Sequence, residues 1–284
     1  MKRVLTALVL IPLVLLVIFK APDWLMILCI GLIALAAVKE YLTIIKGFGV
    51  QPLTTITLLL NAFIFLVYGL ASQAYDLHLE WTDVLISFIF ISPMILLSSA
   101  MGHSPLKEAF TSACYSLLTI PYISGALLSL FLIRQVTGSP FLILFLFTVV
   151  WSGDTLAYYV GRSLGKHKMS PIISPKKTWE GAAASVIGSA ILGSALLVNS
   201  LWISDKLYLH PMHVKLPSIW EAILLSILIN IAAQLGDLAE SMIKRGANIK
   251  DSGSMLPGHG GILDRIDALL FAAPALLIYA IFVR

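Results

Sequence analysis

Residues 218–242, SIWEAILLSILINIAAQLGDLAESM, decide the class of fold. A helix needs about 20 mainly apolar residues to cross the hydrocarbon core of a bilayer, and this stretch is long enough. The chain contains eight further stretches of the same character, so we expect an all-α, polytopic bundle of nine membrane-spanning helices. The predicted spans are residues 4–19, 23–45, 52–71, 83–101, 110–133, 138–160, 179–202, 218–242 and 264–283.

The composition agrees with a membrane protein. Of 284 residues, 59% are hydrophobic and 12% are charged, whereas ordinary soluble domains carry about 25% charged residues. The mean hydropathy of +0.95 also argues against a soluble enzyme, a disordered chain and a secreted disulfide scaffold. The apolar runs are continuous rather than alternating, which argues against a transmembrane β-barrel.

The distribution of Lys and Arg predicts the orientation. With nine spans, the side that holds the N-terminus carries 14 of the 19 basic residues, and the other side carries 5. The positive-inside rule therefore places the N-terminus and the loops at 161–178 and 243–263 in the cytoplasm. The same excess would arise in part if these loops bind phosphates. No basic segment with interleaved aromatic residues is present, so we expect no nucleic-acid partner.

Polar residues form a stripe along the eighth predicted span. Asn230, Gln234, Asp237, Ser241 and Lys244 follow one another at intervals of four, three, four and three, which places them on one face of a helix. One interpretation is a buried polar seam between helices. A carboxylate and an ammonium group on the same stripe favour a functional site, because charges inside a span are unfavourable.

A glycine-rich loop follows this span. Its glycines permit positive φ angles and let backbone N–H groups approach an anion; they are Gly253, Gly258, Gly260 and Gly261. Asp264 and Asp267, three residues apart, lie on one face of the helix that begins the ninth span. They could be helix caps, but their neighbours Lys250, Asp251 and Arg265 favour a charged site.

The sixth predicted span ends in a third polar region. Asp154, Tyr158 and Arg162 lie at successive turns of this helix and therefore share a face. Like the other two regions, they lie toward the predicted cytoplasmic end of a span. Charged residues inside such a span usually mark a functional site.

The loop after the sixth span offers further candidates. Lys166 and Lys168 are interpreted as topology-setting charges at the membrane surface. Lys177 is a candidate for phosphate contact, because it lies in the Ser174-Pro-Lys-Lys-Thr178 segment near the bilayer surface. Thr178, just before Glu-Gly, also resembles a helix N-cap.

Carboxylates beside Lys and Arg, with a glycine-rich loop, suit a metal-bound polyphosphate. Mg²⁺ takes oxygen ligands and commonly binds through one or two carboxylates plus substrate phosphates. Phosphoryl and nucleotidyl transfers depend largely on positioning and charge neutralisation. No His/Cys cluster has zinc-site spacing, and no Gly-x-Ser-x-Gly sequence is present, so zinc proteases and α/β-hydrolases are disfavoured.

Residues 241–267, SMIKRGANIKDSGSMLPGHGGILDRID, resemble the signature of the phosphatidate cytidylyltransferases, also called CDP-diacylglycerol synthases. The resemblance covers 27 contiguous residues with about seventeen specified positions. The segments that begin at Trp151, Ser174 and Gln234 are also similar to the bacterial members. No such motif occurs in residues 1–140, so we expect motif-free helices there and a catalytic region at 141–284.

The resemblance implies that CTP and phosphatidic acid react to give CDP-diacylglycerol and pyrophosphate, with Mg²⁺ alone or with a second cation. Asp237, Lys244 and Asp264 are expected to be catalytic, and Asp267 joins the two aspartates as a metal ligand. The residues expected to bind substrate are Ser174, Lys177, Thr178, Ser241, Arg245, Lys250, His259, Gly260, Gly261 and Arg265. The resemblance also implies a homodimer in the bacterial cytoplasmic (inner) membrane, in contact with membrane lipid.

Two other functions fit parts of the pattern. A CTP-dependent lipid kinase would also bind CTP and Mg²⁺ beside a membrane, but it would release CDP rather than pyrophosphate. A transporter of an anionic metabolite would place charges near the midplane, with matching interruptions in two halves. Here the charges cluster toward one membrane face and the halves do not match, so the enzyme is favoured.

Overall fold

The structure is a computed structural model that describes residues 12–71, 81–102, 105–206, 217–255 and 260–283. The described chain forms two compact units, and each is described by itself. The first unit contains the chain up to Leu128 together with Ile243–Arg265. The second unit contains Ser129–Met242 and Ile266 onward. Helices dominate both units, as the long apolar runs predict.

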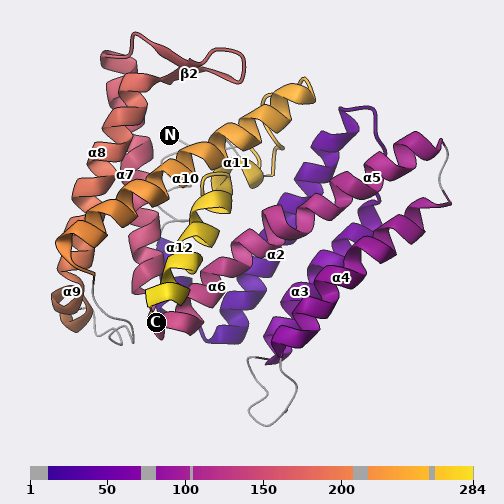
Figure 1. Cartoon of the computed structure of the whole chain (residues 1–284), viewed down its shortest axis with the longest axis horizontal. Helices are drawn as coiled ribbons and strands as arrows, with labels where there is room; N and C mark the ends of the chain where they lie inside the picture. Colours follow the sequence, from indigo (N-terminus) through magenta and orange to yellow (C-terminus); the bar gives the residue numbers. More distant parts are fainter. Residues whose placement is uncertain (1–11, 72–80, 103–104, 207–216, 256–259, 284) are drawn as a thin grey trace. The chain divides into compact units, whose positions relative to one another are not determined.

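Four helices of the first unit lie side by side in Figure 1: α2, α3, α4 and α5. A helix also covers residues 12–20. After α5 the chain continues through a π-helical turn, η1, into α6, which extends into the second unit. The bounds are α2 (Asp23–Lys46), α3 (Thr54–Ala71), α4 (Trp81–Ala100), α5 (Leu106–Thr119), η1 (Ile120–Gly125) and α6 (Ala126–Thr137).

A buried polar cluster joins α3 to the region around η1. The amide of Asn61 donates a hydrogen bond of 2.8 Å to Thr119 Oγ1, and Ser124 Oγ donates one of 2.6 Å to Asn61 Oδ1. Such bonds between helices are a common source of association in membranes, where hydrophobic burial cannot drive helices together. The cluster therefore joins α3 to the end of α5 and to η1.

The second unit is built on the helix pair α7 and α8, which a short antiparallel hairpin of β1 and β2 connects (Figure 1). Helix α12 packs against α7. The bounds are α7 (Phe141–Ser163), β1 (Lys168–Ser170), β2 (Ser174–Thr178), α8 (Trp179–Val198), α9 (Ser200–Lys206), α10 (Ile219–Gly246), α11 (Leu263–Ile266) and α12 (Leu269–Val283).

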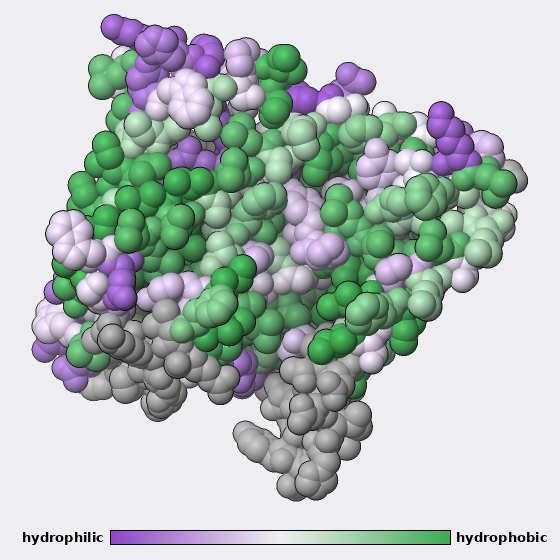
Figure 2. All heavy atoms as spheres, viewed as in Figure 1, coloured by the Kyte–Doolittle hydropathy of each residue, from purple (hydrophilic) through white to green (hydrophobic). Residues whose placement is uncertain are grey.

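The surface of the second unit separates apolar from polar residues. In Figure 2, hydrophilic residues gather around the β1–β2 hairpin, and hydrophobic residues cover much of the helices next to it. Among the exposed apolar residues of α10, four follow one another at intervals of four, three and four: Leu224, Leu228, Ile231 and Leu235. This stripe is a continuous apolar face of the helix, as lipid contact requires.

The fold class predicted from the sequence is confirmed, but the count of nine spans is not. In the described part of the chain, six helices are long and apolar enough to cross a membrane. They are Asp23–Lys46, Leu106–Thr137, Phe141–Ser163, Trp179–Val198, Ile219–Gly246 and Leu263–Phe282. Two shorter apolar helices, Thr54–Leu70 and Ile86–Ala100, lie in the third and fourth predicted spans. The hairpin was not predicted, because three- and five-residue strands have no hydrophobic pattern of their own.

Candidate active site

Lys244 and Asp264 form a buried ion pair in the first unit. Lys244 Nζ lies 2.5 Å from Asp264 Oδ1, and the two side chains are 10% and 9% exposed. Lys244 belongs to the last turn of α10, and Asp264 lies in the short helix α11. The two predicted catalytic residues of the signature loop are therefore in direct contact.

Asp264 also organises the backbone of the loop. Its Oδ2 accepts the N–H of Ser252 at 3.0 Å and the N–H of Gly261 at 2.9 Å. Gly260 has a φ of 83°, a left-handed conformation that suits glycine. The Gly261 amide, which we expected to contact phosphate, donates to a carboxylate of the protein itself in this structure.

A residue that sequence reasoning missed completes this network. Glu40 is buried in α2 at 6% exposure, and it accepts hydrogen bonds from the N–H groups of Ile262 and Leu263 at 3.0 and 2.9 Å. Ser252 Oγ donates a third bond to it at 3.0 Å. The available signal was a carboxylate inside the predicted span 23–45, where charges are rare.

The other predicted basic residues of the loop are exposed: Arg245, Lys250 and Arg265. Arg245 donates a hydrogen bond of 2.9 Å to the carbonyl of Ile249, which helps to shape the turn after α10. The predicted substrate contact His259 lies outside the described residues. Exposed guanidinium and ammonium groups are suited to binding a polyphosphate.

Carboxylates gather in the second unit. Asp237, Glu240 and Asp154 all act electrostatically on Asp267, and we refer to these four residues as the acidic group. Asp237 and Glu240 lie on α10, Asp154 lies on α7, and Asp267 precedes α12. Polar residues of α7, α10 and the segment before α12 are thus close enough in this unit to influence one another.

Lys177 of β2 joins the acidic group through an ion pair. Its Nζ lies 2.7 Å from Asp237 Oδ2, and it also interacts with Asp154. The side chains of Lys177 and Asp237 are 26% and 35% exposed, so both are partly open to solvent. The hairpin therefore places an ammonium group at the carboxylates of two helices.

A glycine explains how Asp267 comes so close to α10. A Cβ atom at Gly236 would lie 2.5 Å from the carbonyl oxygen of Asp267, which no side chain can tolerate. Asp267 Oδ1 accepts the N–H of Ala268 at 2.7 Å, so one of its oxygens has a local capping role. The sequence Gln-Leu-Gly-Asp237 thus contains an acidic residue and also the glycine that leaves room for Asp267.

The polar stripe of α10 has two different parts. Asn230 donates to Ser189 Oγ at 2.8 Å and to Ser185 Oγ at 2.9 Å, and Gln234 donates to Asn230 Oδ1 at 2.6 Å. This part is the buried seam that we considered as an alternative for the whole stripe. The other part carries Asp237, which accepts a 3.4 Å hydrogen bond from Ser241.

The end of α7 and the start of α8 show local polar contacts. Arg162 donates to the hydroxyl of Tyr158 at 2.9 Å, as their spacing predicts. Thr178 Oγ1 accepts the N–H of Gly181 at 3.2 Å, which confirms the predicted N-cap. Glu180 contacts His167 at 2.6 Å, and Ser174 pairs with Ser170 in the hairpin.

Carboxylate oxygens, as in the acidic group, are the type of ligand that a hard divalent cation prefers. Within the described residues no three His, Cys, Asp or Glu side chains are arranged to hold a metal ion by themselves. Mg²⁺ does not require such a set, because it usually keeps several waters and adds substrate phosphates to one or two carboxylates. Asp237 and Asp267 could supply those carboxylates. Because Asp264 belongs to the other unit, its sharing of a metal with them stays a prediction.

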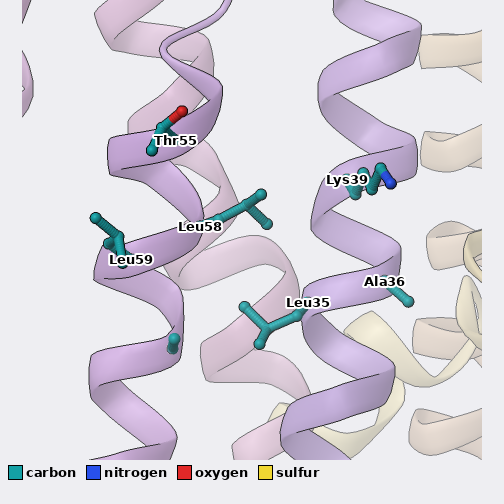
Figure 3. Close-up of a pocket in the computed structure, with 7 residues that line it drawn as sticks. Leu35, Ala36, Lys39, Thr55, Leu58 and Leu59 are labelled. Atoms are coloured by element: carbon teal, nitrogen blue, oxygen red, sulfur yellow. The ribbon is translucent and has the colours of Figure 1, made fainter.

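The first unit also contains an apolar groove between α2 and α3, of about 470 Å³ (Figure 3). Leu35, Leu58 and Leu59 line it, and Lys39 is the charged residue of the lining. A nucleoside triphosphate needs several polar donors, and this mainly aliphatic groove offers one ammonium group. This groove is therefore not a candidate for the CTP site.

Comparison with known proteins identifies the family. The pattern that describes the cytidylyltransferase family matches residues 1–283, which is nearly the whole chain. The chain belongs to the cytidylyltransferase family. This cytidylyltransferase thus carries the family pattern also in residues 1–140, where we found no motif.

Similar proteins with curated names are phosphatidate cytidylyltransferases. That of Staphylococcus saprophyticus is 36% identical over 252 residues, which cover 88% of this chain and 87% of the relative. That of Haemophilus influenzae is 32% identical over 304 aligned residues, covering 99% of both chains. That of Brucella abortus reaches 45% over 161 residues, or 56% of this chain and 54% of the relative.

Proposed function

We propose that this cytidylyltransferase is a phosphatidate cytidylyltransferase, which converts CTP and phosphatidic acid to CDP-diacylglycerol and pyrophosphate. The observation that carries the proposal is the family match over residues 1–283, together with relatives of that name that align over almost their whole length. The signature loop at 241–267 adds the charged residues that a nucleotidyl transfer needs. The membrane-spanning helices supply the environment in which a lipid substrate lies.

The reaction forms a bond between a phosphatidate oxygen and the α-phosphorus of CTP, and it breaks the bond from that phosphorus to the bridging oxygen of pyrophosphate. The phosphatidate phosphate is already anionic near neutral pH, so no general base is strongly required. Lys244, Arg245, Lys250 and Arg265 are proposed to neutralise the triphosphate and the departing pyrophosphate. Lys177 is proposed to contact phosphate beside Asp237.

Asp237 and Asp267 are proposed to hold Mg²⁺, alone or with a second cation. The metal would neutralise phosphate charge and orient the triphosphate for in-line attack. The proximity of Asp154, Asp237 and Glu240 to Asp267 supports this proposal, because a bound cation relieves repulsion between carboxylates. Asp264 as a further ligand remains a prediction from the signature.

A product assay tests the proposed function. Purified protein is incubated with α-labelled CTP, phosphatidic acid and Mg²⁺, and the expected products are a labelled CDP-lipid and pyrophosphate. Release of labelled CDP with a newly phosphorylated lipid would identify a lipid kinase instead. Uptake of a labelled anion into vesicles without chemical change would identify a transporter. Omission of Mg²⁺ is the control for the proposed cofactor.

The proposed location is the bacterial cytoplasmic (inner) membrane, with the loops at 161–178 and 243–263 facing the cytoplasm and a homodimer as the assembly. Lys168→Cys and Ser254→Cys test the orientation, because both positions are exposed. The free cysteines Cys29 and Cys114 are first replaced by Ala. We expect no labelling by an impermeant thiol reagent in intact cells and labelling after lysis. Labelling of both positions from outside would reverse the orientation.

A further inference from the structure

We infer that Glu40 is a positioning residue, whose buried carboxylate holds the signature loop in the conformation that binds CTP. Glu40 lies in α2, more than 200 positions before the loop that it contacts. The expected effect on the kinetics with CTP rests on the proposed function. Its structural part stands on contacts within the first unit alone.

The carboxylate of Glu40 binds the loop at three points. Oε1 accepts the N–H of Ile262, and Oε2 accepts both the N–H of Leu263 and the hydroxyl of Ser252. The amides at the N-terminus of a helix have no partner within the helix, and here they lie at the start of α11. A carboxylate is a strong acceptor for such amides, because a hydrogen bond to a charged group is stronger than one to a neutral group.

Two glycines of the signature are explained by the close approach of Glu40. A Cβ atom at Gly253 would lie 2.6 Å from Glu40 Oε1, and a Cβ atom at Gly261 would lie 2.5 Å from Glu40 Oε2. Neither distance is possible for a real side chain, so Gly253 is required for this contact. At Gly261 the added Cβ atom would also overlap with Ser252 Oγ, so glycine there admits both Glu40 and Ser252. The spacing of glycines that we first assigned to phosphate binding therefore also fits a protein carboxylate.

The contact continues from Glu40 to the predicted catalytic residues. Ser252 donates to Glu40 through Oγ and accepts the N–H of Asp264 on the same oxygen at 3.3 Å. Asp264 in turn pairs with Lys244. Loss of the Glu40 carboxylate would therefore loosen the segment that fixes Asp264 and Lys244. Glu40 touches neither residue: Ser252 lies between it and Asp264, and Asp264 connects this chain to Lys244.

Glu40→Gln tests the inference, with Glu108→Gln as the matched control. Gln keeps the size of Glu, but its NH₂ group cannot accept from a backbone N–H. Glu108 undergoes the same substitution in the same unit at an exposed position of α5. Kinetic constants for CTP and for phosphatidic acid are measured on purified full-length protein, together with the melting temperature.

We expect Glu40→Gln to lower kcat/KM for CTP on the order of 10- to 100-fold with a higher KM for CTP, since small misplacements of charged groups have effects of that size. The KM for phosphatidic acid should stay near that of wild type. A purely structural role would reduce the active fraction, which lowers kcat and leaves both KM values unchanged. That result, or kinetics equal to those of Glu108→Gln, would overturn the inference.

A second pair of variants tests the contact between Glu40 and the loop by a substitution in the loop. Gly253→Ala would press a Cβ atom against Glu40 and should also raise the KM for CTP. Gly102→Ala is its control, because nothing lies within 4 Å of the added Cβ there. This pair tests the inference even if Glu40→Gln does not fold. A KM for CTP in Gly253→Ala equal to that of Gly102→Ala would contradict the inference.

Hydrogen exchange separates this inference from the proposed function. The amides of Ile262 and Leu263 should exchange slowly in wild type and faster in Glu40→Gln, whatever reaction the protein catalyses. Equal exchange in both proteins would overturn the contact. If wild type forms no CDP-lipid while the exchange difference is present, the proposed reaction fails and the positioning of the loop by Glu40 remains.

Discussion

The two charged regions of this protein use carboxylates in opposite ways. In the first unit, the carboxylate of Asp264 is surrounded by donors, namely the ammonium of Lys244 and the amides of Ser252 and Gly261. In the second unit, the carboxylate of Asp267 lies among other carboxylates. Asp264 is thus held by several donors, whereas Asp267 accepts one backbone N–H and lies near three other carboxylates, one of which pairs with Lys177.

This difference indicates different roles for aspartates that look alike in the signature. A carboxylate that accepts several internal hydrogen bonds has few free lone pairs left for a metal. Carboxylates close to one another repel, and a divalent cation relieves that repulsion. We therefore expect the acidic group to bind the metal, and Asp264 to shape the loop that carries the cations.

The largest expected effect comes from Asp237→Asn in the acidic group. Asn keeps the shape of Asp but removes the charge that would hold Mg²⁺, so formation of CDP-lipid should fall by orders of magnitude. The melting temperature should change little, because the loss of the partly exposed ion pair with Lys177 is offset by weaker repulsion among the remaining carboxylates. Activity is measured with labelled CTP, and added Mg²⁺ should not restore it fully.

Asp205→Asn is the control for this substitution, since Asp205 is an exposed aspartate of α9 in the same unit. It should leave the turnover at the wild-type level. Near-normal turnover in Asp237→Asn would remove the acidic group from the active site and would leave the comparison between the two regions without a functional meaning.

Asp264→Asn should differ from Asp237→Asn in its effect on stability. The ion pair with Lys244 is buried, and removal of one partner from such a pair lowers the free energy of unfolding by about 3–5 kcal/mol. Activity should fall as well, because the loop loses its anchor. The melting temperature and the turnover are measured on the same preparation.

A double-mutant cycle sharpens this prediction. The cycle combines Asp264→Asn with Lys244→Met, and the expected coupling energy is about 1–3 kcal/mol, as for residues in direct contact. A stable but inactive Asp264→Asn would instead support the role as a metal ligand that the signature implies. Additive effects of the two substitutions would show that the pair contributes little to the loop.

The sequence predicted the helices well, for a physical reason. Within a bilayer every backbone N–H and C=O group needs a partner inside its own segment, so a long apolar run has almost no alternative to a helix. Contacts within one helix or across one turn were also predictable, such as the pair Tyr158 and Arg162 and the cap at Thr178. These depend on spacing alone.

Contacts between distant segments were not predictable in the same way. Glu40 lies 223 positions before Leu263, and no periodicity connects the two. Both Glu40 and Glu240 were nevertheless carboxylates inside predicted spans, which the unfavourable transfer of charge into a membrane marks as candidates. The division of the α10 stripe into a seam and an acidic part depends on which neighbours face Asn230 and Asp237, and that is a property of packing.

The smallest expected effect concerns Thr178, next to Lys177 in β2, and it tests how far the acidic region extends. The Thr178 side chain is buried, its hydroxyl caps α8, and a Cβ atom at Gly161 would lie 3.1 Å from that hydroxyl. Thr178→Ala should therefore lower the free energy of unfolding by about 1 kcal/mol, and Thr178→Ser should restore it, because Ser caps as well as Thr. Activity should follow the folded fraction. A KM for CTP that rises in Thr178→Ala at unchanged stability would assign the hydroxyl to substrate binding, as predicted from the sequence, and would extend the site from Lys177 to its neighbour.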